Sequence, residues 1–170
     1  MLLRTVVIDG GSGSGKTTLA RRLGKLWSEQ CGQQVQVVGL DSFYPGWFGL
    51  AEASRMVHQD VLRADSPGYL RWDWERNQPA DWVALDPQLP LLVEGCGALT
   101  PESAKLAGLT IWVELDAVTR KHRALARDGD SFAPWWDAWA EQEQALWRAN
   151  RPQELAMFRG DAAGLPGLRG

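Results

Sequence analysis

The chain has 170 residues, of which 45% are hydrophobic and 23% are charged, a size and balance typical of one globular domain with a full core. Its formal net charge of −3 gives no general reason to expect nucleic acid or a membrane as a partner. No apolar run approaches the roughly 20 residues that span a bilayer, and the N-terminus lacks the pattern of a signal peptide. We therefore expect a cytoplasmic protein, monomeric or homodimeric.

Strands and helices are expected to alternate in the first part of the chain. Leu2–Ile8 is a short apolar, β-branched run that predicts a buried strand. A helix is expected from Lys16, with leucines at helical spacing on one face, to a glycine cap at Gly32. Val35–Leu40 predicts a second strand, and Leu50–Ala64 a second helix.

The middle of the chain gives weaker signals. The aromatic and acidic segment Tyr69–Glu75 supports no assignment, and Gln78–Leu85 is interpreted as a short helix. Leu89–Val93 predicts a third strand and Leu109–Leu115 a fourth. Between these strands, Thr100 followed by a proline is the pattern of a capped helix start.

The last part of the chain is expected to be mainly helical. Asp116 should cap a helix that runs through Arg127, and a final helix is expected over Trp135–Ala149. The tail, residues 151–170, is rich in Gly and Ala and predicts no element. Strands alternating with helices predict an α/β domain over residues 1–150, a three-layer sandwich with a mostly parallel sheet. In such sheets ligands bind at the carboxyl ends of the strands.

The loop after the first expected strand carries the most specific motif of the sequence. Gly10–Thr17 matches G-x-x-x-x-G-K-[ST] at every fixed position and lies between an expected strand and an expected helix, which is the context of a P-loop. Its glycines let backbone N–H groups approach phosphate oxygens, and the helix start adds its positive end. We expect the phosphates of ATP to contact Gly11, Ser12, Gly13, Ser14, Gly15, Lys16, Thr17 and Thr18.

Four side chains at strand ends are expected to complete a transfer site. Lys16 should reach the β and γ phosphates, and the Thr17 hydroxyl should hold Mg²⁺. Asp41 follows the second strand, where a carboxylate can act as general base toward a substrate hydroxyl or bind Mg²⁺ through water; a turn cap is the alternative. Glu94 ends the third strand and is expected to support the metal, through water, or the substrate; an acid at a surface strand end is the alternative.

Arg120, Arg123 and Arg127 are spaced by three and four residues, which places them on one helix face. Arginines beside a transferring phosphoryl group neutralise the charge of the transition state. We expect Arg120 and Arg127 to be catalytic, with a solvated basic face as the alternative.

The segment Trp72-Asp73-Trp74-Glu75 combines indole rings with carboxylates. It could stack a planar ring and bind sugar hydroxyls through Asp73, and packing onto the core is an equal alternative. Trp72, Asp73 and Tyr44 are therefore candidate contacts of a small-molecule substrate.

In order and type, these motifs resemble those of uridine kinase-like proteins, a group that includes uridine–cytidine kinases, nicotinamide riboside kinases and phosphoribulokinase-type enzymes. The resemblance covers residues 1–150 and rests on residues 11–18, Asp41-Ser42-Phe43-Tyr44, Trp72-Asp73-Trp74, Val93-Glu94-Gly95 and Arg120…Arg127-Asp128. It implies a P-loop NTPase fold and ATP-dependent phosphorylation of a hydroxyl, often that of a nucleoside, with Asp41 as base. It also implies a mobile helical lid over residues 120–134. Members usually have a fifth strand after the last helix, and residues 161–167 show no β-rich run.

The leading hypothesis is thus a kinase that uses ATP and Mg²⁺ to phosphorylate a small molecule, such as a nucleoside. An adenylate-kinase-type kinase of nucleotides or small acids would want further arginines near its substrate, and Arg55, Arg63, Arg71 and Arg76 are available. A nucleotide-binding regulator without kinase activity would need the P-loop but not Asp41.

Overall fold

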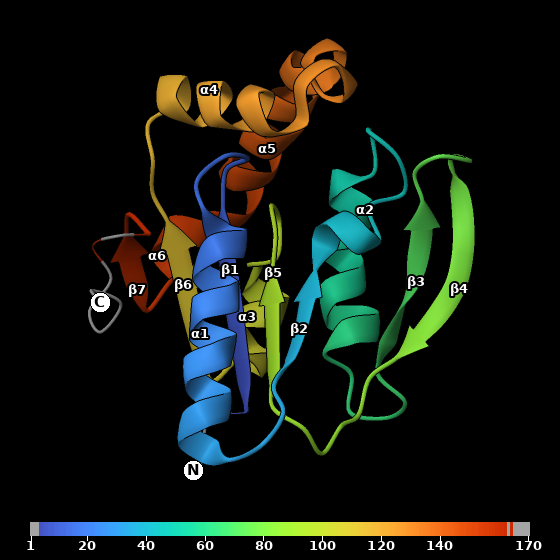
Figure 1. The fold of residues 1–170 in the computed structure, drawn as a ribbon, viewed down its shortest axis with the longest axis vertical. Coiled ribbons are helices and arrows are strands. Elements are labelled where there is room, and N and C mark those ends of the chain that lie inside the picture. Colours follow the sequence, from blue (N-terminus) through green and yellow to red (C-terminus); the bar gives the residue numbers. More distant parts are fainter. Residues whose placement is uncertain (1–3, 163, 165–170) are drawn as a thin grey trace.

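The computed structural model of the chain describes residues 4–162 and 164. The first residues of the expected strand Leu2–Ile8 and the end of the tail lie outside this part. Among the described residues, five strands form one parallel sheet in the order β2-β5-β1-β6-β7 (Figure 1). In chain order these strands are β1 (Thr5–Gly10), β2 (Gln36–Gly39), β5 (Leu91–Glu94), β6 (Leu109–Val113) and β7 (Phe158–Gly160).

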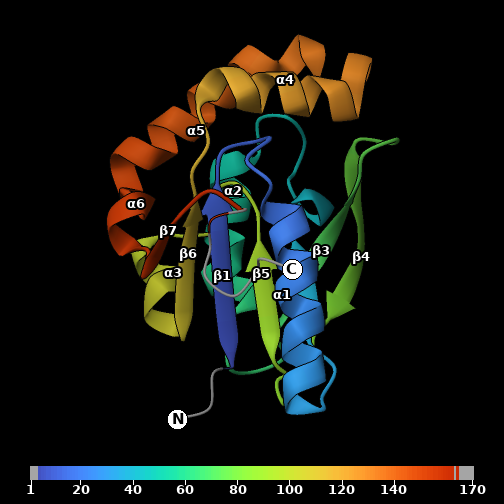
Figure 2. The ribbon, with the colours of Figure 1, turned by 60° about the vertical axis from the view of Figure 1, so that its left-hand side comes forward.

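Helices cover both faces of this sheet (Figures 1 and 2). They are α1 (Lys16–Cys31), α2 (Leu50–Met56), α3 (Pro101–Leu106), α4 (Ala117–Asp128), α5 (Trp136–Asn150) and α6 (Pro152–Leu155). Helix α1 packs on one face against Val6 and Ile8, whereas α2 and α5 pack on the other face with Val7. Side chains alternate along a strand, so β1 supplies both cores. The predicted three-layer α/β sandwich with a P-loop NTPase fold is confirmed.

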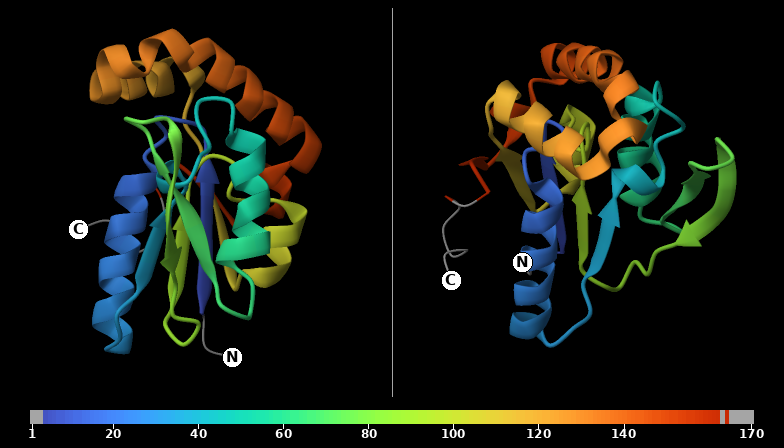
Figure 3. Two further views of the ribbon diagram at one scale, coloured as in Figure 1. Left: turned by 90° about the vertical axis from the view of Figure 1, so that its right-hand side faces the viewer. Right: turned by 45° about the horizontal axis from the view of Figure 1, so that its top comes forward.

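Three helix boundaries were expected from capping residues and are found there. Gly32 ends α1 in the left-handed region, with φ of 64°. The Thr100 hydroxyl accepts the N–H of Ser103 at 3.1 Å and starts α3. The Asp116 carboxylate accepts the N–H of Thr119 at 2.9 Å and starts α4, which crosses above the carboxyl edge of the sheet (Figure 3).

The short helix expected over Gln78–Leu85 is wrong. β3 (Gly68–Asp73) and β4 (Gln78–Ala84) pair as an antiparallel hairpin, which stands beside α2 (Figure 3). Asn77 turns the chain with a φ of 51°, and the Asp73 carboxylate accepts two backbone N–H groups of the turn. Turn chemistry and cross-strand pairing override the local helix preference of this segment.

Two further elements differ from the expectation. The helix expected over Leu50–Ala64 stops at α2 and continues as a π-helical turn only to Val61. The segment 152–160, for which no element was predicted, forms α6 and β7, and Phe158 pairs with Ile111 of β6. This fifth strand lies just before residues 161–167, which show no β-rich run, and it is too short to give a periodic pattern. In the described part of the chain, no helix is long and apolar enough to cross a membrane.

Candidate functional site

The P-loop Gly10–Thr17 connects β1 to α1 at the carboxyl edge of the sheet. Gly13 and Gly15 have φ angles of 79° and 99°, a region that glycine adopts without strain. Helix α1 begins at Lys16, and its Nζ donates to the carbonyl oxygen of Gly11 at 2.9 Å. The loop therefore folds around the ammonium group, beside the positive end of α1.

The ammonium group of Lys16 is held in a buried, anionic setting. Burial alone would lower the pKa of Lys16, but the carboxylates around it, Glu94 and Glu143 among them, outweigh this and raise it. The Cys96 thiol lies 3.4 Å from Nζ. Lys16 thus remains a cation at the place where the motif requires one.

Thr17 and Glu94 provide two oxygen atoms suited to magnesium. The Thr17 hydroxyl donates to Glu94 Oε1 at 3.0 Å, and Glu94 is only 5% exposed at the end of β5. Burial raises the pKa of Glu94, and the nearby Lys16 opposes that rise. A hydroxyl and a carboxylate at this spacing fit Mg²⁺, which completes its shell with phosphate oxygens and waters.

Asp9 ties the start of the P-loop to the loop after β5. One carboxylate oxygen accepts the N–H groups of Gly10 at 2.6 Å and Gly97 at 3.1 Å, and the other accepts that of Leu99 at 2.9 Å. Asp9 is fully buried. The two loops that carry Lys16 and Cys96 are therefore held in one arrangement.

We expect the stability of the protein to depend on the titration of Asp9. Burial raises the pKa of Asp9 from 3.8 to about 7, and its hydrogen bond from Leu99 and the charge of Lys16 oppose the rise. The folded chain then binds this proton more tightly than the unfolded chain. The contribution to the free energy of unfolding is full below the unfolded pKa, near pH 4, and is lost as the pH rises to about 7.

Denaturant unfolding of the wild type and Asp9→Asn between pH 4 and 8 tests this expectation. The variant cannot titrate here, so its free energy of unfolding should fall less steeply with pH than that of the wild type. Equal slopes for the two proteins would contradict it.

A cavity of about 350 Å³ opens beside the P-loop and is called here the aromatic cavity. Asp41 stands at its wall in the 3₁₀ turn Leu40–Ser42 after β2, with an exposed side chain, and its backbone carbonyl accepts Trp74 Nε1 at 2.9 Å. Of the predicted residues, the cavity brings together Ser12, Thr17, Asp41, Tyr44 and Arg127. Its other lining residues are Arg21, Trp47, Trp74, Cys96, Asp128, Phe132 and Trp139.

Trp72 and Asp73 are not brought into this site. Asp73 caps the turn of the β3–β4 hairpin, and neither residue lines the aromatic cavity, whereas Trp74 does. The four arginines considered for a nucleotide or acid kinase are also elsewhere. Each forms a surface ion pair, and none of them lines the cavity: Arg55–Glu52, Arg63–Asp60, Arg71–Asp81 and Arg76–Asp73.

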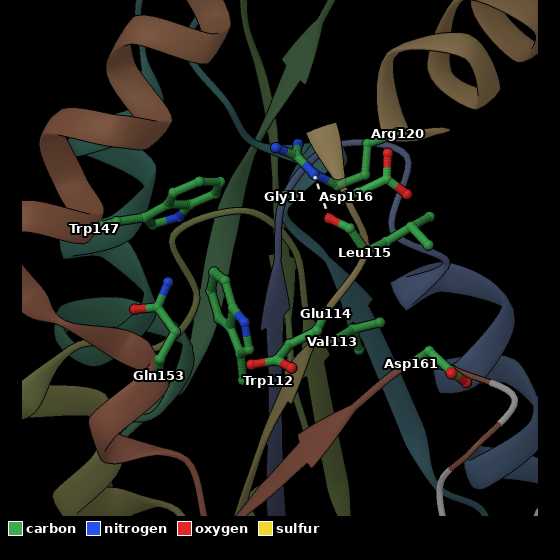
Figure 4. Close-up of a pocket in the computed structure, with 10 residues that line it drawn as sticks. All are labelled: Gly11, Trp112, Val113, Glu114, Leu115, Asp116, Arg120, Trp147, Gln153 and Asp161. Atoms are coloured by element: carbon green, nitrogen blue, oxygen red, sulfur yellow. Dashed lines mark hydrogen bonds between the residues drawn. The ribbon is translucent and has the colours of Figure 1, made fainter. Parts of the chain in front are cut away.

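The two arginines expected to be catalytic line different cavities. Arg127 lines the aromatic cavity and pairs with Asp128 at 2.6 Å. Arg120 lines a cavity of about 500 Å³ beside the end of β6, shown in Figure 4, where its Nε donates to the carbonyl of Leu115 at 3.2 Å. Arg123, between them on α4, is exposed. The P-loop thus has one predicted arginine in each cavity beside it.

The close contact with Arg120 gives a reason why two P-loop positions are glycine. A Cβ on Gly11 would overlap the Arg120 guanidinium, and a Cβ on Gly13 would overlap the Arg120 backbone carbonyl. These positions were expected to be glycine so that phosphate could approach. In the structure they also let the start of α4 lie directly on the loop.

Glu143, which was not predicted from the sequence, lies on α5 and is 1% exposed. Its Oε1 accepts the P-loop N–H of Ser12 at 2.7 Å, and its Oε2 lies 3.4 Å from Arg120 Nη1. One feature of the sequence could have identified it. Glu143 is an acid at helical spacing from Trp136 and Trp139, on the face that a helix normally fills with apolar side chains.

A strand, a P-loop and a helix that open a parallel sheet define the P-loop NTPase class, and the comparisons with known proteins agree. A family model described as NACHT domain matches residues 4–44, which contain β1, the P-loop, α1 and β2. A solved structure described as a possible uridine kinase from Bacillus stearothermophilus superposes with a TM-score of 0.63 at 18% identity, covering 95% of this chain and 90% of the other.

In sequence, the chain is similar to proteins named uridine kinase, as the motifs predicted. The uridine kinase of Halobacterium salinarum is 30% identical over 141 residues, which cover 71% of this chain and 60% of that protein. That of Clostridium perfringens is 26% identical over 140 residues, which cover 71% of this chain and 66% of the relative. The chain thus spans less than two thirds of the length of these relatives.

Proposed function

We propose that the chain is a kinase that uses ATP and Mg²⁺ to phosphorylate a hydroxyl group of a small molecule, with nucleosides as the first class to test. The observation that carries this proposal is the aromatic cavity, in which the carboxylate of Asp41, the P-loop residue Thr17 and the arginine Arg127 line one space. A carboxylate facing the phosphate loop is what phosphoryl transfer to a hydroxyl requires. A protein that only binds nucleotide has no need of it.

Each residue of the site has its own role in the proposed phosphoryl transfer. Lys16 and the P-loop N–H groups bind the β and γ phosphates. Thr17 would hold Mg²⁺, with Glu94 supporting the metal through water or acting on the substrate, and the ion would supply positive charge against the phosphates. Asp41 accepts the proton of the acceptor hydroxyl. The oxygen of that hydroxyl bonds to the γ phosphorus of ATP, and the bond from this phosphorus to the oxygen of the leaving ADP breaks. Arg127, which lines the same space, neutralises charge on the transferring group, and residues 120–134, which contain it, are assigned the role of a lid that closes over the site.

The lining of the cavity supports an acceptor that contains a ring. Trp47, Trp74 and Trp139 contribute indole surface, which suits stacking or edge contact with a base or a sugar. The sequence similarity to proteins named uridine kinase points to the same class of acceptor. The arginines that a nucleotide or acid kinase would use pair elsewhere on the surface.

The test is acceptor-dependent ADP release from Mg·ATP, measured with a panel of nucleosides, nucleoside monophosphates and small hydroxy acids. We expect release with one or more nucleosides. Release only with monophosphates or acids would favour the adenylate-kinase-type alternative. Binding of Mg·ATP without release across the panel would favour a nucleotide-binding regulator.

A further inference from the structure

We propose that Glu143 is a positioning residue for nucleotide binding, because it holds Arg120 and the backbone of Ser12 in the arrangement in which the P-loop receives the phosphates. The inference rests on the proposed nucleotide site but not on the identity of the acceptor. Neither Glu143 nor its helix is part of the P-loop motif.

The contacts hold the backbone of one residue at both its N–H and its carbonyl. Glu143 Oε1 accepts the N–H of Ser12 at 2.7 Å, and Arg120 Nη1 donates to the carbonyl oxygen of Ser12 at 3.2 Å. The carboxylate and the guanidinium are themselves 3.4 Å apart. Donor and acceptor of a single P-loop residue are thus bound by one ion pair.

The backbone of Ser12 needs external support because both neighbouring residues are glycines. Ser12 lies between Gly11 and Gly13, whose backbone torsions are the least restricted of any residue. Without the ion pair, the backbone of Ser12, and with it the direction of the neighbouring loop N–H groups, is poorly fixed by the chain itself. Phosphate binding depends on loop N–H groups that already point the right way, since ordering them on binding costs affinity.

The burial of the pair favours a specific role over general packing. Glu143 is 1% exposed, and the Arg120 side chain is 11% exposed. Burying a carboxylate costs free energy unless it is paired and hydrogen-bonded, and apolar residues often stabilise such a site better. The Arg120 guanidinium also lies 5.5 Å over the Trp147 ring, so that it is held between the ring, the carboxylate and the loop.

Mg·ADP is the probe, and its Kd is measured calorimetrically with Glu143→Gln. This variant keeps an oxygen for the Ser12 N–H but removes the charge that holds Arg120. We expect its Kd to rise about tenfold, while Glu141→Gln, an exposed change on the same helix, stays within twofold of the wild type. In an Arg120→Ala background, Glu143→Gln should have little further effect, because Glu143 acts through Arg120.

The other possible results would contradict the positioning role of Glu143. An unchanged Kd with a lowered Tm would show that Glu143 only stabilises the fold, and a lower Kd would show that its carboxylate competes with phosphate. Additive effects in the double variant would exclude the route through Arg120. Should Glu143→Gln not fold, Arg120→Lys, which keeps the charge but loses the planar fork, must raise the Kd; an unchanged Kd overturns the inference. No binding by the wild type would instead overturn the proposed function.

Discussion

Replacement of Lys16 by Met is expected to lower phosphoryl transfer by about three orders of magnitude and to weaken Mg·ADP binding by one to two orders of magnitude. Methionine keeps the length of the side chain but removes its charge. Lys16 is 7% exposed, and its pKa stays raised despite burial because of the nearby carboxylates Glu94 and Glu143. Its ammonium is therefore a fixed, desolvated cation, the condition in which a charge stabilises phosphate most.

Calorimetry with Mg·ADP and the rate of ADP release with the acceptor found in the panel measure the two effects. Lys16→Met leaves the buried carboxylate of Glu94 without its neighbouring cation, so we also expect a lower Tm. Binding should therefore be measured at a temperature well below the Tm of the variant. Lys25→Met is the matched control, since Lys25 lies on the same helix with a side chain 78% exposed. Wild-type affinity in Lys16→Met would contradict the assignment of the loop.

The parts of the fold that could be predicted are those in which local sequence agrees with long-range structure. The apolar run of β1, the glycine cap of α1 and the caps of α3 and α4 each act within a few residues. Gln78–Ala84 was predicted incorrectly because its conformation depends on pairing with β3, which no local pattern reveals. β7 was missed because three residues cannot show a period, although the edge of β6 fixes them.

The candidate site shows the same division. Thr17, Asp41 and Glu94 could be placed together from sequence, because strand order alone brings the carboxyl ends of parallel strands to one edge. Glu143 could not be placed there from sequence, because it lies 131 residues from Ser12 along the chain, on a separate helix. The choice between Trp72 and Trp74 depended on the direction of side chains in a hairpin that the sequence did not predict.

Asp41→Asn is expected to abolish turnover while leaving Mg·ATP affinity within a few-fold of the wild type. A general base contributes about two to four orders of magnitude to a rate, and asparagine cannot accept the proton. The hydrogen bond from Trp74 goes to the backbone carbonyl of Asp41, so the substitution leaves it in place. The exposed side chain gives no reason to expect a change in stability.

The difference between rate and affinity is what identifies the role of Asp41. If Asp41 only capped a turn, Asp41→Asn would lower the Tm and leave kcat unchanged in the protein that folds. If it mainly held the metal, Mg·ATP affinity would fall together with kcat, and added Mg²⁺ would restore part of both. Asp65→Asn, an exposed aspartate outside the aromatic cavity, controls for loss of surface charge. Only a loss of kcat at nearly constant affinity and Tm fits a base that acts on the acceptor hydroxyl.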